Sequence, residues 1–347
     1  MKAVRLRNQE DLAVQNVDDP VPAAGEIVLR IDSAHICGTD LRMYRHGHKG
    51  RDASAYLTLG HEVAGEIAAL GEGVEGYTVG HPAVVAPNYG CGVCDLCVSG
   101  QTHLCRRSEA LGVTRNGGFA EYMLIPAQAV AQGNVTELEG GASLAEAALA
   151  EPFSCVINAF ERSHNSVGES VLVIGAGPIG LMHAMLHKSA GAGTVMITDI
   201  NGERLAAAKE IDPDFTIIDG DLEELVREQT RGRGADVVIT AAPVPSIQQA
   251  ALRVAAINGR VVFFGGLPKD KQEVTLNTNT IHYNQLIVTG TTRQSLKQFR
   301  EAVAMIESGR VNLKPLITER FDLDHAVAAF EQALQGRGLR TGFSIGG

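Results

Sequence analysis

The sequence contains no tryptophan, and aromatic residues make up only 5% of its 347 positions. No apolar run approaches the roughly 20 residues that a membrane-spanning helix needs. The opening residues MKAVRLRNQEDLAV include no apolar core of the kind found in signal peptides. We therefore expect no membrane span, no secretory leader and a cytoplasmic location. The missing tryptophan by itself excludes no function.

Basic residues are scarce relative to acidic ones. Lysine and arginine total 30 and aspartate and glutamate total 40, so the formal net charge is −10. This sign argues against a general nucleic-acid or anionic-membrane binder, and the partner that we expect is a small molecule. The chain is too long for one ordinary hydrophobic core, so two domains are predicted.

Cysteines number only six, and four of them lie close together with the spacing C-x2-C-x2-C-x7-C. These four are Cys91, Cys94, Cys97 and Cys105. Such short gaps let one loop supply four thiolates to a tetrahedral zinc ion, and Gly90 and Gly92 are expected to allow its tight turns. A disulfide pair is the alternative, which a reducing compartment disfavours. We predict a closed structural zinc site with no position left for substrate.

The chain changes character near Pro152. Before it, short strands alternate with turns that contain glycine or proline. The expected strands include 26–31, 63–70, 83–86 and 119–125. Helical periodicity at 295–308 and 324–334 marks a tail that we expect to return to the first domain. The predicted domains are 1–153, 154–291 and 292–347.

Between Pro152 and the tail, apolar runs alternate with helical stretches. The expected strands are 171–174, 195–198, 215–218, 236–240, 260–264 and 285–289. The expected helices include 179–190, 203–211, 222–229 and 246–256. This alternation predicts an α/β fold with a doubly wound parallel sheet of the Rossmann type.

A dinucleotide motif follows the first of these strands directly. The motif is Gly175-Ala-Gly177-Pro178-Ile179-Gly180. Its three glycines are expected to make a tight turn, to let the backbone approach a pyrophosphate and to allow close helix–strand packing. The phosphates would lie at the helix N-terminus, where free N–H groups favour anions. An ordinary tight turn is the alternative.

Asp199 ends the next strand and is expected to bind the ribose hydroxyls of this cofactor. A carboxylate there would repel a 2′-phosphate, so we predict NAD rather than NADP. Arg204 could weaken this preference by reaching toward the same ribose. The alternative role of Asp199 is an N-cap for the helix that starts near Asn201.

A second set of metal-binding side chains is dispersed along the chain. Cys37, His61, Glu62 and Glu151 combine a thiolate, an imidazole and two carboxylates. These donors suit a zinc site with an open position. Their spacing alone does not establish such a site, because a lone cysteine is usually a small core residue and a lone histidine is usually a core histidine with its hydrogen bonds made.

The whole chain resembles the zinc-dependent medium-chain dehydrogenase/reductase superfamily, specifically its polyol (sorbitol-like) dehydrogenase branch. The signature GHE-x2-G-x5-G-x2-V is complete from Gly60 to Val74. The four-cysteine loop, GGFAEY (117–122) and GAGPIG occur in the family's order. The resemblance implies a GroES-like, β-rich catalytic domain beside the Rossmann domain, with the active site in the cleft that faces the nicotinamide.

The resemblance also implies roles for the dispersed donors. Cys37 and His61 become ligands of a catalytic zinc, Glu62 a ligand or near-ligand, and Glu151 a residue that binds zinc or holds its water. Two zinc ions per chain follow, one catalytic and one structural. Simple alcohol dehydrogenases commonly have a cysteine near Glu151, and Cys155 lies close enough in the sequence to keep that alignment open.

Further assignments concern the proton relay and the cofactor. Thr39 lies where the family places a hydroxyl that relays the proton, although a turn hydroxyl is the alternative. Many relatives have a histidine where this chain has Arg42, and an arginine cannot act as a base. The relay could instead use water, ribose hydroxyls, His46 or His48. We also expect Gly265, Gly266 and Thr291 to lie at the cofactor.

Four side chains are expected near the substrate: Tyr44, Arg115, Glu151 and Arg293. A structural ion pair is the alternative for Arg293. The basic stretch 46–51 is either a solvated loop or a site for a phosphate or acid group of the substrate. His81 replaces a usual aspartate and is expected to be a surface or turn histidine.

We therefore expect an enzyme that transfers hydride from a secondary alcohol of a polyol, cyclitol or sugar-alcohol phosphate to NAD. An L-threonine 3-dehydrogenase is the first alternative, and a non-catalytic NAD- or zinc-binding protein is a distant one. A zinc-free quinone or enoyl reductase is disfavoured because those relatives lack this ligand set. The resemblance implies a homo-oligomer, a tetramer or a dimer.

Overall fold

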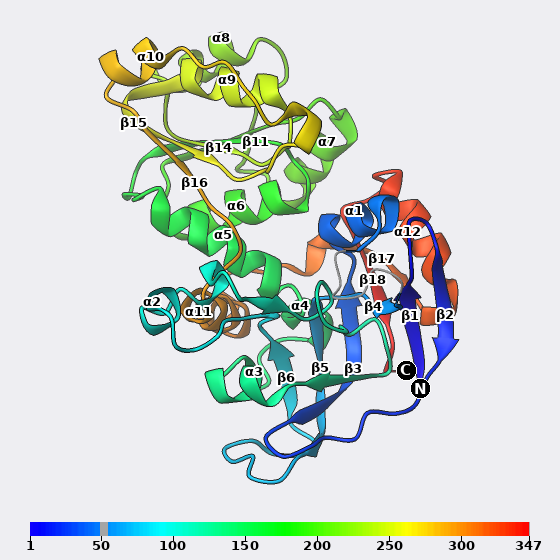
Figure 1. Ribbon diagram of the computed structural model, residues 1–347. Helices are drawn as coiled ribbons and strands as arrows, with labels where there is room; N and C mark the ends of the chain where they lie inside the picture. The colour runs from blue at the N-terminus through cyan, green and yellow to red at the C-terminus, as the bar shows by residue number, and fades with distance from the viewer. Residues whose placement is uncertain (49–54, 347) are drawn as a thin grey trace. The chain divides into compact units, whose positions relative to one another are not determined.

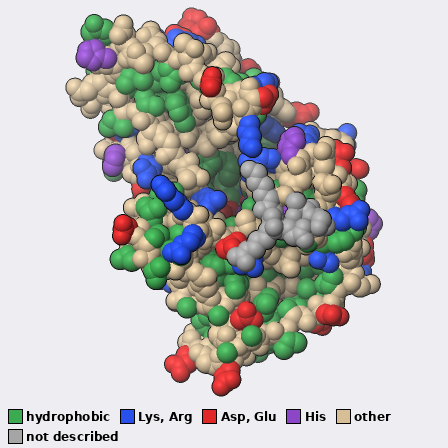
Figure 2. All heavy atoms as spheres, viewed as in Figure 1, with side chains coloured by type: hydrophobic (Ala, Val, Ile, Leu, Met, Phe, Trp, Pro, Cys, Tyr) green, Lys and Arg blue, Asp and Glu red, His purple; other side chains and the backbone are tan. Residues whose placement is uncertain are grey.

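The computed structural model describes residues 1–48 and 55–346, and it divides into two compact units (Figure 1). The first unit contains Met1–Ser154 and Gln294–Gly347, and the second contains Cys155–Arg293. Among the described residues, no helix has the length and apolar character needed to cross a membrane. On the face drawn in Figure 2, acidic and basic side chains lie interspersed among uncharged atoms.

The first unit is built on a seven-stranded sheet with the order β10-β6-β5-β3-β18-β17, in which β9 also pairs with β3. Its strands are β3 (Ile27–His35), β5 (Glu62–Leu70), β6 (Pro82–Val85), β9 (Tyr122–Ile125), β10 (Val135–Glu137), β17 (Ile317–Phe321) and β18 (Arg340–Ser344). β18 pairs antiparallel with β3, so the end of the chain joins the sheet of its first 154 residues.

Smaller elements complete this unit. A three-stranded sheet contains β1 (Lys2–Leu6), β2 (Leu12–Asn16) and β4 (Leu57–Thr58), and a two-stranded one contains β7 (Asn88–Tyr89) and β8 (Glu109–Ala110). The helices are α1 (Gly38–His46), α2 (Asp95–Val98), η1 (Thr102–Leu104), α3 (Ala127–Gln132), α4 (Leu144–Ala147), α11 (Leu296–Glu307), η3 (Lys314–Leu316), η4 (Leu323–His325) and α12 (Ala326–Leu334). Helix α5 (Ala150–Arg162) runs across the boundary into the second unit.

Three phenylalanines at the centre of the first unit join distant parts of the chain. Phe119 contacts Phe343 of β18 with ring centroids 4.9 Å apart and Phe330 of α12 at 6.1 Å, both edge to face. All three rings are fully buried or nearly so. Edge-to-face pairs add about 0.5–1.5 kcal/mol each beyond their buried area, so these contacts attach the tail firmly to the first unit.

The second unit is a six-stranded parallel sheet with the order β13-β12-β11-β14-β15-β16. Its strands are β11 (Ser170–Ile174), β12 (Thr194–Thr198), β13 (Thr216–Ile217), β14 (Ala235–Thr240), β15 (Ala255–Phe263) and β16 (Ile287–Gly290). The helices are α6 (Pro178–Ser189), α7 (Gly202–Ile211), α8 (Leu222–Gln229), α9 (Pro245–Val254), η2 (Lys269–Lys271) and α10 (Thr278–Tyr283), and they cover both faces (Figure 1). This is the strand order of dinucleotide-binding domains, so the predicted fold class is confirmed.

One element differs from its sequence prediction. We expected a helix as far as residue 256 and a strand from 260, whereas β15 already begins at Ala255. The register against β14 shifts between Ala235 and Val237, and Asn258 has φ +61°. Asn258-Gly259 has the composition of a turn, so a β-bulge inside the strand was mistaken for the loop before it.

Gly180 is required where α6 packs on β11. A Cβ atom added there would lie 1.7 Å from the backbone oxygen of Gly175, whereas one added at Gly202, at the start of α7, would meet nothing within 4 Å. We predict that Gly180→Ala lowers the free energy of unfolding by roughly 1–3 kcal/mol, as overpacking does. Thermal denaturation measures this, with Gly202→Ala as the control. Equal stability of the two variants would contradict the packing argument.

Candidate functional site

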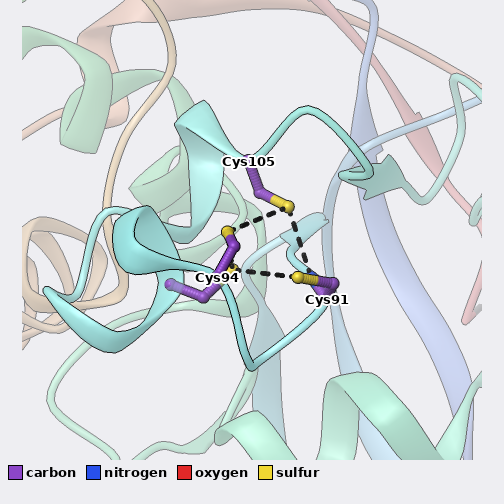
Figure 3. A group of neighbouring side chains, drawn as sticks. Cys91, Cys94 and Cys105 are labelled. Carbon is purple, nitrogen blue, oxygen red and sulfur yellow. Dashed lines mark hydrogen bonds between the residues drawn. The ribbon is translucent and has the colours of Figure 1, made fainter.

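The four clustered cysteines form a compact group of sulfur atoms in the first unit. The Sγ atom of Cys94 lies 3.6 Å from that of Cys97 and 3.7 Å from that of Cys105, and the Sγ atoms of Cys91 and Cys97 are 4.0 Å apart. The sulfurs of Cys91, Cys94 and Cys105 point toward one another (Figure 3). A tetrahedron with Zn–S bonds of about 2.3 Å has edges of about 3.8 Å. The spacing therefore fits a zinc ion.

The loop around this group is shaped by its two glycines in different ways. Gly92 has φ +79° and makes the expected turn. Gly90 serves for a different reason, because a Cβ atom there would lie 2.4 Å from the Sγ of Cys97. The four cysteines of the loop are free thiols, which contradicts the disulfide alternative. A backbone hydrogen bond involving Val93 lowers the pKa of Cys91 to about 6, which favours the thiolate that binds metal.

A second cluster brings together Cys37, His61 and Glu62, with one ligand atom from each all within 4.8 Å of one another. Antiparallel pairing of β3 and β5 places His35 opposite Glu62. Cys37, which follows β3 at the N-cap of α1, is therefore next to His61. Strand register thus assembles donors that lie 24 residues apart in the sequence.

Asp40 supports both Cys37 and His61 from the first turn of α1. Its Oδ2 accepts the backbone N–H of Cys37 at 2.8 Å, and its Oδ1 lies 3.5 Å from Nδ1 of His61. Burial alone would lower the pKa of His61, but the carboxylate of Asp40 and the thiolate of Cys37 raise it well above its ordinary value. The cluster is therefore strongly attractive to a cation.

Arg340, on β18, holds Glu62 of β5 across the intervening strand β3. Its Nη2 donates to Oε1 of Glu62 at 2.9 Å, and its Nη1 donates to the carbonyl oxygen of Ile36 at 3.2 Å. Both side chains are buried. Burial raises the pKa of Glu62 to about 7 although Arg340 pulls it down. One oxygen of Glu62 is thereby fixed in a charged hydrogen bond.

Several buried polar atoms of this cluster have no hydrogen-bond partner in the part of the chain that the structure describes. They are Nδ1 of His61, Oε2 of Glu62 and Oδ1 of Asp40. Buried polar atoms are rarely left unsatisfied without reason. Thiolate, imidazole and carboxylate are the ligands of catalytic zinc sites, which use three protein ligands and keep one position open. The residues present fit a catalytic zinc ion.

Glu151 lies in the first turn of α5 and is buried. It does not belong to the three-donor group, but its Oε1 accepts the amide Nε2 of Gln294 at 3.0 Å. Burial raises its pKa, and the positive field of His61 opposes that rise. Glu151 thus contributes to the electrostatics of the cluster, and its direct contact with a metal stays a prediction.

The expected substrate and relay residues lie in varied surroundings. Thr39 is half-buried in the first turn of α1. The ring of Tyr44 packs on Phe330 with centroids 5.5 Å apart, and Nη2 of Arg115 lies 3.5 Å from Glu109. Arg293 ends the second unit with φ +55°. Their contacts with substrate stay predictions.

The remaining polar residues of interest lie near the surface or in loops. Arg42 and His46 are exposed on α1, and Nε2 of His48 is 2.9 Å from the carbonyl oxygen of Ala55. His81 is half-exposed and lies 3.5 Å from Glu137, in agreement with a turn histidine. Residues 49–51 of the basic stretch lie outside the described residues. Cys155 is a half-buried thiol on α5.

The dinucleotide loop in the second unit has the expected shape. Gly175 has φ +116° at the end of β11, and Pro178 begins α6 at its first position. A Cβ atom at Gly177 would meet nothing within 4 Å. The protein therefore leaves open the space beside Gly177, as a cradle for a pyrophosphate requires. The loop fits a dinucleotide.

Asp199 closes this loop through backbone contacts. Its Oδ2 accepts the N–H of Ala176 at 2.7 Å, and its Oδ1 accepts the N–H of Asn201 at 2.9 Å. Nη1 of Arg204 lies 3.9 Å from Oδ2. Helix α7 is capped by the side chain of Asn201, so Asp199 is not its N-cap. Its carboxylate is held at the loop and keeps lone pairs for further donors.

Later cofactor candidates follow strands at the same edge of this sheet. Gly265 follows β15, and a Cβ atom there would lie 3.0 Å from the backbone of Ala242. Gly266 has open space, and Thr291 directly follows β16. Ligands of open α/β sheets bind outside the carboxyl ends of strands, so the placement is consistent with a cofactor role.

Sequence reasoning missed Asp40, Arg340 and Gln294 as parts of the site. The sequence could have indicated Asp40, because an acidic residue three positions after a helix N-cap often accepts the backbone N–H of the cap residue. No such pattern indicated Arg340 or Gln294. Arg340 lies 278 positions from Glu62, and Gln294 lies 143 positions from Glu151.

Two family models match the chain. The model described as Alcohol dehydrogenase GroES-like domain matches residues 23–135, and the one described as Zinc-binding dehydrogenase matches residues 178–308. A sorbitol dehydrogenase of Halalkalibacterium halodurans is 33% identical over 336 residues, which is 94% of each chain. An L-threonine 3-dehydrogenase of Yersinia enterocolitica is 32% identical over 342 residues, which is 97% of each chain.

A solved structure agrees with these relatives. A protein of Sinorhizobium meliloti, described as a zinc-binding dehydrogenase bound to NADP, has a TM-score of 0.90 at 28% identity and covers 99% of this chain and 98% of its own. Family models, full-length relatives and fold therefore agree. The chain belongs to the zinc-dependent medium-chain dehydrogenase superfamily, in its polyol branch, and is an oxidoreductase of that class.

Proposed function

We propose that this enzyme oxidises a secondary alcohol of a polyol, cyclitol or sugar-alcohol phosphate with NAD. The observation that carries the proposal is the buried group of Cys37, His61 and Glu62, which has the donors of a catalytic zinc site. The similarity to a sorbitol dehydrogenase supports a polyol as the substrate class. Glu151 stands where simple alcohol dehydrogenases commonly have a cysteine, so it supports the polyol or threonine class over simple alcohol dehydrogenases.

The residues divide the chemistry among them. Zinc bound by Cys37, His61 and Glu62 would supply the Lewis acidity that lowers the pKa of a substrate hydroxyl, and NAD would supply the hydride acceptor. Asp40 orients His61, and Arg340 holds one oxygen of Glu62.

Proton transfer is proposed to begin at the hydroxyl of Thr39. That hydroxyl can both accept the proton of the substrate and pass its own onward. Exposed Arg42 cannot take the proton, because a guanidinium is always protonated. Water, ribose hydroxyls, exposed His46 or buried His48 are the candidates for the end of the relay.

L-Threonine 3-dehydrogenase activity is the second candidate. The Yersinia relative of that name is nearly as similar to this chain as the sorbitol dehydrogenase, at 32% against 33% identity. Overall similarity therefore does not separate the two substrates. A non-catalytic role is disfavoured, because the candidate metal ligands Cys37, His61 and Glu62 and the hydroxyl of Thr39 are all present.

We predict that an activity screen will find NAD reduction with at least one polyol, cyclitol or sugar-alcohol phosphate. The panel contains hexitols, pentitols, inositols, their phosphates and L-threonine. Removing metal with a chelator should abolish turnover, and added zinc should restore it. Turnover of L-threonine alone would favour the second candidate. Zinc and NAD binding without oxidation of any alcohol would support the non-catalytic alternative.

We further propose that NAD is the preferred cofactor. The support is the carboxylate of Asp199, which is held at the glycine loop where a 2′-phosphate would be repelled. The Sinorhizobium relative is described as bound to NADP, and Arg204, 3.9 Å from Asp199, is the residue that could tolerate that phosphate here. The balance between the negative charge of Asp199 and the positive charge of Arg204 sets the preference between NAD and NADP.

Replacing Asp199 tests this balance. We predict that Asp199→Ala raises KM for NAD by about 10-fold to 100-fold, the loss of one charge-assisted hydrogen bond, and raises the relative activity with NADP. Steady-state kinetics with both cofactors measure the change. The control is Glu203→Ala, which replaces an exposed acidic residue in the first turn of α7. An unchanged cofactor ratio in Asp199→Ala would exclude the proposed selectivity.

We propose two zinc ions per chain, with the four-cysteine loop holding a structural one. The support is the sulfur spacing of 3.6–4.0 Å.

Cys105→Ala is predicted to reduce the zinc content by one ion per chain and to lower Tm, because metal binding contributes directly to folding. Elemental analysis and thermal denaturation measure both effects. Cys155→Ala should keep both ions, and loss of zinc in that control would reopen the ligand assignment.

A homo-oligomeric state and a cytoplasmic location also stay predictions. A four-cysteine zinc site needs reduced cysteines and therefore suits a reducing compartment. Exposed Ile287 lies on β16, the edge strand of the second unit's sheet, and exposed Tyr283 ends α10, the helix before that strand. An apolar sheet edge favours pairing with another chain, and sedimentation velocity measures the resulting mass.

A further inference from the structure

A chain of buried amides leads to Glu151 inside the first unit. Nδ2 of Asn88 donates to Oε1 of Gln294 at 3.3 Å, and Nε2 of Gln294 donates to Oε1 of Glu151 at 3.0 Å. The three side chains are 7%, 3% and 7% exposed. They come from β7, the start of the returning tail and α5, three parts of the chain that only folding brings together.

The direction of this chain of hydrogen bonds is determined by chemistry. A carboxylate only accepts, so Gln294 must present its NH2 group to Glu151 and its oxygen to Asn88. A flipped amide would place two acceptors against each other and two donors against each other. Asn88, which donates its Nδ2 to the oxygen of Gln294, stabilises the orientation in which Gln294 can hold the carboxylate.

Both amides are themselves held by the backbone around them. The backbone carbonyl oxygen of Asn88 accepts a hydrogen bond from Nδ2 of Asn134 at 2.8 Å. Asn88 also lies on β7, which pairs with β8. Gln294 directly precedes Ser295, the N-cap of α11, whose backbone N–H donates to Oε1 of Gln298 at 2.9 Å. Gln294 thus lies just outside the capped end of α11, and its side chain takes no part in the cap.

The two carboxylates near the zinc cluster are held in different ways. Glu62 accepts from the charged guanidinium of Arg340, whereas Glu151 accepts from the neutral amide of Gln294. A neutral donor fixes the position of an oxygen without cancelling its charge. Glu151 therefore combines a defined position with a negative charge that can act on the metal, its water or a substrate hydroxyl.

We propose that Gln294, oriented by Asn88, is a positioning residue that fixes the carboxylate of Glu151 for catalysis. The inference rests on the proposed function, because it assumes that Glu151 acts in the zinc site. Residues that hold the groups around a metal change affinity or activity by about 10-fold to 100-fold when they are lost. A structural role alone would change stability and leave these quantities unaltered.

The test introduces Gln294→Met into two backgrounds, the natural chain and Glu151→Ala. Methionine keeps the length of the side chain and removes the hydrogen bonds to Asn88 and Glu151. In the natural background we expect kcat/KM for the alcohol to fall at least tenfold and the affinity of the catalytic site for Co2+, in competition with a chelator, to fall about tenfold. In Glu151→Ala, the same change should have little further effect, since residues that act through one another are not additive.

A buried glutamine nearby provides the matched control. Gln298 caps α11 and is 7% exposed. Gln298→Met should lower Tm while it leaves kcat/KM and Co2+ affinity within about twofold. Asn88→Leu should reproduce part of the Gln294→Met loss in both quantities. Equal losses from Gln294→Met with and without Glu151, or from Gln298→Met, would overturn the inference.

Failure of the proposed function gives a different result. In that case the unaltered enzyme oxidises none of the alcohols in the panel. The Co2+ affinities of Gln294→Met in the two backgrounds remain measurable without activity and still decide whether Gln294 acts through Glu151. An unchanged Co2+ affinity in Gln294→Met would then refute the positioning role.

Discussion

Buried negative charge is the constraint on which the first unit depends. Asp40, Glu62 and Glu151 are nearly inaccessible to solvent, and all three interact electrostatically with His61. Burying one unpaired charge costs several kcal/mol. Arg340 offsets part of this cost at Glu62, and the unsatisfied atoms of the cluster show where a metal cation would offset the rest. The strands that carry these groups must therefore pair in one register, because a slip would separate the charges.

The two metal clusters use similar ligands for opposite purposes. The four-cysteine loop is local, and its four sulfurs lie close enough to fill the four positions of a tetrahedral zinc ion. The group of Cys37, His61 and Glu62 supplies three donors, which would leave one position of a zinc ion open. A zinc ion with four protein ligands stabilises a loop, whereas a zinc ion with one position free of protein ligands can bind a substrate oxygen. The difference lies in the number of protein donors that converge.

The second unit depends on close approach rather than on charge. A side chain at Gly180 would collide with the carbonyl of Gly175, whereas the space beside Gly177 is open. Gly180 is thus required for close packing, whereas Gly177 leaves space for a bound cofactor. Asp199 completes the loop by accepting a backbone N–H from it, so the residue proposed to select the cofactor also stabilises the loop that would hold it.

Features whose physics is local could be predicted from the sequence alone. The apolar runs of single strands, the glycine loop and the four-cysteine spacing each depend on residues within a few positions of one another, so short patterns predicted them. The bulge at Asn258 was missed because it has the composition of a turn. Only the family resemblance allowed Cys37 and His61 to be assigned to the same site. Only the tertiary structure revealed Arg340 and Gln294, since their contacts with Glu62 and Glu151 span 278 and 143 positions. Spacing along a chain carries no information about such contacts, because sheet register and the return of the tail bring them together.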